Sequence, residues 1–248
     1  MKSILKGLLL AMVLSPCCAA SASEAAPAET KEPAPQDAAN RMIEAAQGRL
    51  APVYAPLAEH IAKTFDLADR SGIGIDLGSG PGTLVIELCK RTPMHWINAD
   101  INPHFFAYFI QEAQKAGVGH RVSAMLADAH ALPFRDDYAD VIVSRGSFQF
   151  WQDKPQAFRE IHRVLKPGGV AFIGRGFSPN LPVETARRIR DTQKQGKGFP
   201  KYDVEETAAE LRTVMQRIGI ADFRIQTPRP PGAEDVSYGI WIEFRKPQ

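Results

Sequence analysis

The sequence predicts an α/β fold: a three-layer αβα sandwich around a mostly parallel, seven-stranded sheet with an antiparallel last strand. Two observations carry this prediction. Short apolar runs alternate with segments of helical periodicity, an order that places parallel strands between two helical layers. The last two runs, in contrast, are joined by residues 228–237 (PRPPGAEDVS), where no helix is expected, so the final strand should be antiparallel to its neighbour.

The bounds of the elements follow from apolar runs, caps and breakers. Gly117 ends one helix, Asp153 can cap the next, and Asp203 with Glu206 has capping-box spacing before another. A strand, a glycine-rich turn and a helix in direct succession are typical of Rossmann-like folds. The expected strands are 73–77, 95–99, 122–126, 138–144, 170–173, 223–227 and 238–244; the expected helices are 39–65, 83–90, 103–116, the segment between 153 and 167, 183–194 and 204–218.

The N-terminal segment predicts export. Lys2 and Lys6 precede a short apolar run, and small residues up to Ala22 supply a cleavage site, so residues 1–22 are expected to be a signal peptide and the protein periplasmic. LSPC, which ends at Cys17, resembles a bacterial lipobox with proline where a small residue is usual, so a membrane anchor is expected only if Cys17 is lipidated. Residues 23–38, rich in Ala, Pro and Glu, are expected to be a disordered linker before a domain at 39–248.

Charge and cysteine content narrow the function classes. The formal net charge is +2, and without Lys2 and Lys6 there are 28 basic residues (30 minus 2) against 28 acidic ones. A neutral domain lacks the basic footprint of nucleic-acid binding, so no nucleic-acid partner is expected. Only Cys89 lies outside the leader, which rules out a disulfide within the mature domain, and its apolar surroundings predict a buried thiol.

The stretch GIDLGSGPGTL identifies a ligand-binding turn. Gly78, Gly80 and Gly82 let the backbone turn sharply and approach a ligand closely. A dinucleotide turn, G-x-G-x-x-G, would need glycine where this chain has Thr83. The chain instead reads D-x-G-x-G-x-G from Asp76 to Gly82, which resembles the first motif of class I S-adenosylmethionine-dependent methyltransferases.

Further segments resemble that family in the same order. Asp100 matches the acid on the ribose hydroxyls, and a carboxylate can accept two hydrogen bonds from a diol. Asp128, in LADAHALPFRDDYADVIVS, matches the acid that accepts from the adenine amino group. HRVLKPGGVAFI resembles the helix, turn and strand that come next, so the resemblance covers 72–173 and is nearest to quinone-biosynthesis methyltransferases that act on small molecules.

The resemblance implies S-adenosylmethionine as the cofactor and assigns a set of residues to it. Each of them also has a purely structural interpretation, as a tight turn, a helix cap or a loop acid. The assigned residues are Asp76, Gly78, Ser79, Gly80, Gly82, Asp100, Ile101, Asp128, Ala129 and Ser144.

The catalytic and substrate residues are less constrained. Methyl transfer starts from an activated donor, so alignment can suffice without a strong base; His130 is the candidate base, and no metal is expected. Arg145 and Arg175 are expected to clamp a carboxylate or phosphate, or else to pair with local acids. The remaining substrate candidates are Tyr54, Phe148 and Trp151, and the two last are alternatively core residues.

Three functions are compatible with these features. The first is methyl transfer from S-adenosylmethionine to a small anionic or aromatic molecule, since SRGS after the fourth strand is not the Asn/Asp-Pro-Pro-aromatic motif of enzymes that methylate amino groups of bases or glutamine. The second is an exported, non-catalytic binding protein, because the cofactor is made inside the cell. The third, a nicotinamide oxidoreductase, is disfavoured by Thr83. The basic helix 183–194 either covers the substrate pocket or is a solvated face.

Overall fold

The structure is a computed structural model that describes residues 36–195, 203–230 and 232–248. The predicted signal peptide, Cys17 and the linker up to residue 35 lie outside the described residues. The chain divides into units Met1–Glu32 and Pro33–Gln248, and every described residue belongs to the second unit. The linker is predicted to reach Ala38, whereas the first helix, α1, begins at Gln36.

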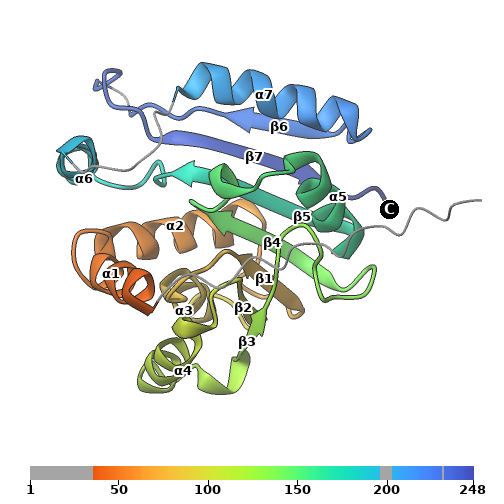
Figure 1. Cartoon of the computed structure of the whole chain (residues 1–248), viewed down its shortest axis with the longest axis horizontal. Coiled ribbons are helices and arrows are strands. Elements are labelled where there is room, and N and C mark those ends of the chain that lie inside the picture. Colours follow the sequence, from red (N-terminus) through yellow and green to blue (C-terminus); the bar gives the residue numbers. More distant parts are fainter. Residues whose placement is uncertain (1–35, 196–202, 231) are drawn as a thin grey trace, which may run out of the picture. The chain divides into compact units, whose positions relative to one another are not determined.

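The described residues form a seven-stranded sheet of order β3-β2-β1-β4-β5-β7-β6 (Figure 1). Strands β1 to β5 run parallel, and β7 is antiparallel to both β5 and β6. The predicted fold class is therefore confirmed, including the antiparallel last strand. The strands are β1 Ile73–Leu77, β2 His95–Asp100, β3 Val122–Leu126, β4 Ala139–Arg145, β5 Leu165–Gly176, β6 Phe223–Gln226 and β7 Gly239–Arg245.

Helices cover both faces of the sheet. Alternate strand residues divide between two apolar clusters: Val143 and Phe172 pack with α1 to α4 and α6, whereas Ile142 and Ile173 pack with α5 and α7. The helices are α1 Gln36–Gln47, α2 Ala51–Thr64, α3 Thr83–Cys89, α4 Phe106–Lys115, α5 Lys154–Val164, α6 Val183–Gln195 and α7 Val204–Arg217, with 3-10 turns η1 Pro103–Phe105, η2 Gly119–Arg121 and η3 Phe148–Phe150.

Several helix bounds differ from the predictions; the helix expected over 103–116, for example, is the 3-10 turn η1 followed by α4. The helix expected over 39–65 is two helices, because the chain turns at 48–50 before α2 begins at Ala51, with Pro52 in its first turn. The helix capped by Asp153 ends at Val164, before Pro167, and Leu165 already begins β5 opposite Ala139. Caps at Asp153 and Asp203 are present as expected.

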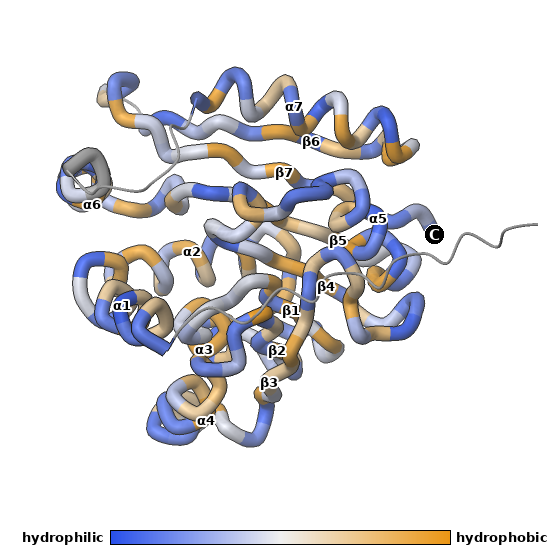
Figure 2. The backbone as a smooth tube through the Cα atoms, in the orientation of Figure 1, coloured by the Kyte–Doolittle hydropathy of each residue, from blue (hydrophilic) through white to orange (hydrophobic). Residues whose placement is uncertain are grey.

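Hydropathy follows the layers. Figure 2 shows mostly apolar colours along the central strands, whereas α4 and α7 alternate between polar and apolar turns. Such alternation is expected of helices with one face on a core and one in water. Within the described part of the chain, no helix is long and apolar enough to cross a membrane.

Candidate active site

The glycine turn after β1 excludes side chains for two different reasons. Gly78, Gly80 and Gly82 all have left-handed φ values, of 68°, 56° and 73°. A Cβ on Gly78 would lie 2.3 Å from the Cβ of Ser147, and one on Gly82 would lie 2.1 Å from the ring of Phe109. At Gly80 there is room, so the backbone conformation alone requires glycine there. The turn, residues 78–82, thus presents glycine backbone at the carboxyl end of β1, and we call it the glycine ledge.

Asp100, at the end of β2, is joined to this ledge. Its Oδ2 accepts the Gly80 amide at 2.7 Å, and its Oδ1 accepts the Asn102 amide at 2.8 Å. Burial raises the pKa of the carboxyl, and these backbone hydrogen bonds oppose the rise. Each oxygen keeps a second lone pair for a hydroxyl. Ile101, the next residue, is 39% exposed and adds an apolar surface beside the acid.

Asp76 is the least satisfied polar group of the site. Its side chain lies on the α2 face of the sheet, in register with Asn98 and Val143, and the residue is 2% exposed. Its Oδ1 has no hydrogen-bond partner among the described residues. Burial, and then the charge of Asp100, raise the pKa of Asp76 to about 8, although Arg145 lowers it. A buried acceptor without a partner costs about 1–3 kcal/mol, so this oxygen is suited to a donor from a ligand.

Asp128 and His130 are hydrogen-bonded to each other, so His130 is not a base with unbonded ring nitrogens. His130 Nδ1 lies 2.6 Å from Asp128 Oδ1, which also accepts the His130 amide at 2.9 Å. His130 Nε2 accepts the amide of Asp153 at 3.2 Å, so Nδ1 carries the proton and donates it to Asp128. The expected role of His130 as a base therefore finds no support: both ring nitrogens are occupied, and the ring holds Asp128 in place.

The serine hydroxyls of the site donate hydrogen bonds to other groups of the protein. Ser147 donates to the Leu77 carbonyl at 3.1 Å, so the buried Ser144 hydroxyl, 2.6 Å away, must donate to Ser147. Ser79 donates to Oδ1 of Asn98, and the Asn98 amide donates to the Gly80 carbonyl at 3.3 Å. Ala129 is buried.

Sequence reasoning missed Asn98 and Ser147, which both hydrogen-bond to the backbone at this turn, Asn98 to Gly80 and Ser147 to Leu77. The signal for Asn98 was a polar residue inside the buried run HWINA.

On the substrate side, Arg145 is a cation without an ionic partner among the described residues. Its Nε donates to the Gly176 carbonyl at 3.2 Å, and its guanidinium lies 5.6 Å from the ring centroid of Tyr54. Burial lowers its pKa; Tyr54 and Asp76 oppose this, whereas Arg175 lowers it further. Within the described residues, Arg145 makes no ion pair, so its predicted alternative, pairing with a local acid, is not found there.

The aromatic candidates after β4 are core residues. Phe148 and Trp151 are 2% and 7% exposed, and Trp151 packs edge-on against Phe158 of α5 at 5.7 Å between ring centroids. Their burial favours the alternative expectation, that both are core residues. The 3-10 turn η3 instead exposes Phe150, at 61%. Tyr54 is buried over Arg145.

Helix α6 is tied to its surroundings. Arg187 pairs with Asp235 at 3.1 Å, and the Arg190 guanidinium lies 4.6 Å from the ring centroid of Phe177, just after β5. Some basic side chains in the described part of α6 therefore contact other parts of the fold. This weakens the interpretation of the helix as a purely solvated face.

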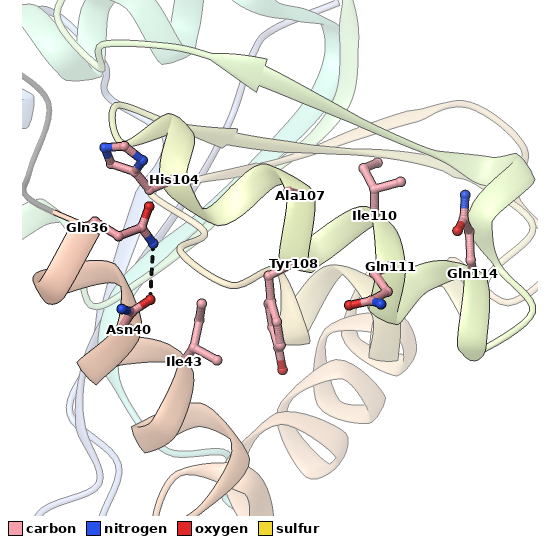
Figure 3. A pocket seen from close by; sticks show the side chains of 9 residues that line it. All are labelled: Gln36, Asn40, Ile43, His104, Ala107, Tyr108, Ile110, Gln111 and Gln114. Atoms are coloured by element: carbon pink, nitrogen blue, oxygen red, sulfur yellow. Dashed lines mark hydrogen bonds between the residues drawn. The ribbon is translucent and has the colours of Figure 1, made fainter.

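A separate hollow of about 750 Å³ lies between α1 and α4 (Figure 3). Four of its nine lining residues carry side-chain amides, and the Gln36 amide donates to Asn40 along α1. None of the predicted site residues lines it, so it is a neighbour of the glycine turn and not the turn itself. Its lining consists of Gln36, Asn40, Ile43, His104, Ala107, Tyr108, Ile110, Gln111 and Gln114.

Known proteins match this chain in sequence and fold. The family described as "Methyltransferase domain" matches residues 75–173, the part that carries the turn, Asp100 and Asp128. A Methanococcus maripaludis protein, solved as a candidate S-adenosyl-L-methionine-dependent methyltransferase, is 32% identical over 86% of this chain and 94% of its own, with a TM-score of 0.71.

Curated relatives differ in activity. Human mitochondrial arginine-hydroxylase NDUFAF5 is 27% identical over 66% of this chain and 46% of its own length. The ubiquinone/menaquinone biosynthesis C-methyltransferase UbiE of Vibrio vulnificus is 36% identical over 49% of each protein. The chain thus spans about half the length of these relatives, and their names describe different reactions and substrates. The fold, the glycine turn and the Methanococcus match together show that the chain belongs to the class I S-adenosylmethionine-dependent methyltransferase family.

Proposed function

We propose that the protein transfers a methyl group from S-adenosylmethionine to a small anionic molecule. The observation that carries the proposal is the pairing of a bare glycine ledge with the buried, unpartnered Oδ1 of Asp76. A ligand that places an ammonium group there would satisfy this oxygen and stabilise the ionised carboxylate. The amino-acid part of S-adenosylmethionine carries such a group.

The other groups of the site fit the same ligand. Asp100 holds lone pairs beside Ile101, as a ribose diol and an adjacent base require. Asp128, oriented by His130, is suited to accept from the adenine amino group. The cofactor-binding residues expected from the sequence stay predictions in their individual roles.

The residues of this chain promote the reaction by aligning the methyl donor and the acceptor. When bound, S-adenosylmethionine supplies a methyl group on a sulfonium centre, an activated donor. The ledge fixes one partner, and Arg145 offers a charge to hold the other, so their relative position is set before reaction. Because both ring nitrogens of His130 are occupied, no histidine base is assigned to the reaction.

The leader supports a periplasmic location as part of this proposal, with membrane attachment only through a lipidated Cys17. The same leader favours a second candidate function, a non-catalytic exported protein that binds a small ligand in the cleft. The two functions differ in turnover: only the first forms S-adenosylhomocysteine when an acceptor is present.

Calorimetry with S-adenosylmethionine on the full chain tests the proposal. We expect micromolar binding that weakens at least tenfold in Asp76→Asn and is unchanged in Asp69→Asn, an exposed aspartate in the chain before β1. Absence of binding by the wild-type protein would overturn the proposal. Binding without formation of S-adenosylhomocysteine from any small anionic acceptor would favour the non-catalytic function.

A further inference from the structure

The turn after β4 contains a second buried acceptor without a partner. The side-chain amide of Gln149 donates from Nε2 to the Gly146 carbonyl at 2.6 Å. Its Oε1 is buried and has no hydrogen-bond partner within the described residues. Exchanging the two ends of the amide would set Oε1 against the Gly146 carbonyl, two acceptors face to face, so the orientation is fixed by the short bond. The acceptor is therefore held in place before any donor arrives.

Space is open at Gly146, whose carbonyl accepts the Gln149 side-chain amide. Gly146 has a φ of 82°, and a Cβ added there would meet no atom within 4 Å. The same turn is seated on the glycine ledge, because Ser147 donates to Leu77 and touches the Cβ position of Gly78. Gln149 thus belongs to a turn that contacts the ledge and has free volume beside it.

Arg145, the residue before Gly146, brings positive charge to this turn. It lies on the same face of the sheet as Asp76, two residues beyond Val143, which is in register with Asp76. Arg49 and Arg175 are close enough to lower its pKa, so three cations share the region. Asp76, on the same face, raises the pKa of Arg145 and so offsets part of this positive charge. A guanidinium in such a place favours an anion.

We infer that this turn recognises the substrate at two points: Arg145 binds an anionic group, and Gln149 Oε1 accepts a hydrogen bond from a hydroxyl or amine on the same molecule. The substrate class is a small carboxylate or phosphate that also carries a hydrogen-bond donor. This inference rests on the proposed function for the neighbouring methyl donor, but the recognition itself requires only the turn. Carboxylates and phosphates share the chemistry that Arg145 binds.

The test uses matched small ligands on the full chain saturated with S-adenosylhomocysteine. Calorimetry compares 3- and 4-hydroxybenzoate with benzoate, which lacks the donor, with phenol, which lacks the anion, and with 4-hydroxyphenyl phosphate, which exchanges the anion. We expect at least one hydroxylated anion to bind tenfold or more tightly than both benzoate and phenol. The ratio between its carboxylate and phosphate forms distinguishes the two anions.

Variants assign the two contacts. Gln149→Met should abolish the advantage of the hydroxylated anion over benzoate, whereas Gln152→Met, at an exposed position in the same segment, should keep it. Arg145→Met should weaken all anions at least tenfold, and Arg145→Lys should recover part of the loss. Thermal unfolding of each variant shows that it is folded. An equal preference in wild type and Gln149→Met, or no preference among the ligands in wild type, would overturn the inference.

The two failures are distinguishable. If the wild-type protein does not bind S-adenosylhomocysteine, the proposed function fails, and the same ligand series without cofactor still tests the turn. If S-adenosylhomocysteine binds but the ligand preferences are absent, the inference fails alone.

Discussion

The turn after β1 consists largely of glycines without side chains, whereas the turn after β4 contains side chains with polar atoms that lack a hydrogen-bond partner among the described residues. Gly78 and Gly82 are in contact with neighbours that no Cβ could tolerate, and Asp100 bonds the ledge. Arg145 and Gln149, in contrast, each have one end bonded to a backbone carbonyl and the other end without a bonded partner in the described part of the chain. The comparison teaches that the two regions are built differently: the glycine turn depends on backbone conformation together with buried acids, whereas the turn after β4 depends on the side chains of Arg145 and Gln149.

The largest expected effect separates core from site within the β4 turn. Phe148→Ala should lower the free energy of unfolding by about 3–5 kcal/mol, because it leaves a cavity beneath α5. Phe150→Ala, two residues on and exposed, should change it by less than about 0.5 kcal/mol. Urea denaturation of both variants measures the difference. Similar losses would show that Phe150 belongs to the packed core as well.

The ledge can be tested with a matched pair of glycines. Gly82 and Gly117 have nearly the same φ, 73° and 74°, but a Cβ meets Phe109 at 2.1 Å in the first case and nothing within 4 Å in the second. Gly82→Ala should therefore destabilise the fold by about 2–4 kcal/mol and abolish cofactor binding, whereas Gly117→Ala should cost about 1 kcal/mol of backbone strain and leave binding intact. Equal losses of stability in urea would mean that strain alone requires glycine at 82.

Asp76 should make the free energy of unfolding depend on pH. Its folded pKa of about 8 lies above the ordinary 3.8, so the folded state keeps a proton that the unfolded state loses between these values. Its contribution to the free energy of unfolding is therefore greatest below about pH 4 and declines as pH rises towards 8. Asp76→Asn should remove this decline, and unfolding free energies at pH 6 and pH 8 measure it.

A wild-type protein whose stability difference between pH 6 and pH 8 equals that of the variant would show that Asp76 is ionised throughout. Asp69→Asn controls for removal of one surface charge.

The smallest effect concerns the brace on Asp128. His130→Phe removes a hydrogen bond to Asp128 and the acceptor for the Asp153 amide, so the Kd for S-adenosylmethionine should rise about threefold to tenfold. His120→Phe, at an exposed position, should leave the Kd unchanged. Under saturating cofactor, turnover should be retained in His130→Phe. A collapse of turnover at saturation would restore His130 as a catalytic base.

The fold and the ledge were predictable because their signals are local. A strand, three glycines and an acid at the next strand end have fixed spacing, and both Asp76 and Asp100 lie where the pattern indicates. The substrate side was only partly predictable. Arg145 could be placed at a strand end, but the exposure of Phe150 rather than Phe148 depends on a 3-10 turn that apolar patterning does not predict.

The sequence also could not predict which buried polar atoms lack a hydrogen-bond partner. Gln149 was not predicted, because the spacing of residues carries no information on which atom of a side-chain amide lacks a hydrogen-bond partner. The break between α1 and α2 was missed because the apolar period continues across Gly48.

The position of β7 has a consequence for how the chain folds. Strand β7 follows β6 in the chain but lies between β5 and β6, and Trp241 of β7 stacks on Phe172 at 4.5 Å between ring centroids. During synthesis β6 emerges first and cannot join the sheet until β7 has appeared. The sheet of a nascent chain therefore stays incomplete at one edge through most of translation. Completion of the sheet therefore waits for residues 239–245, close to the end of the chain.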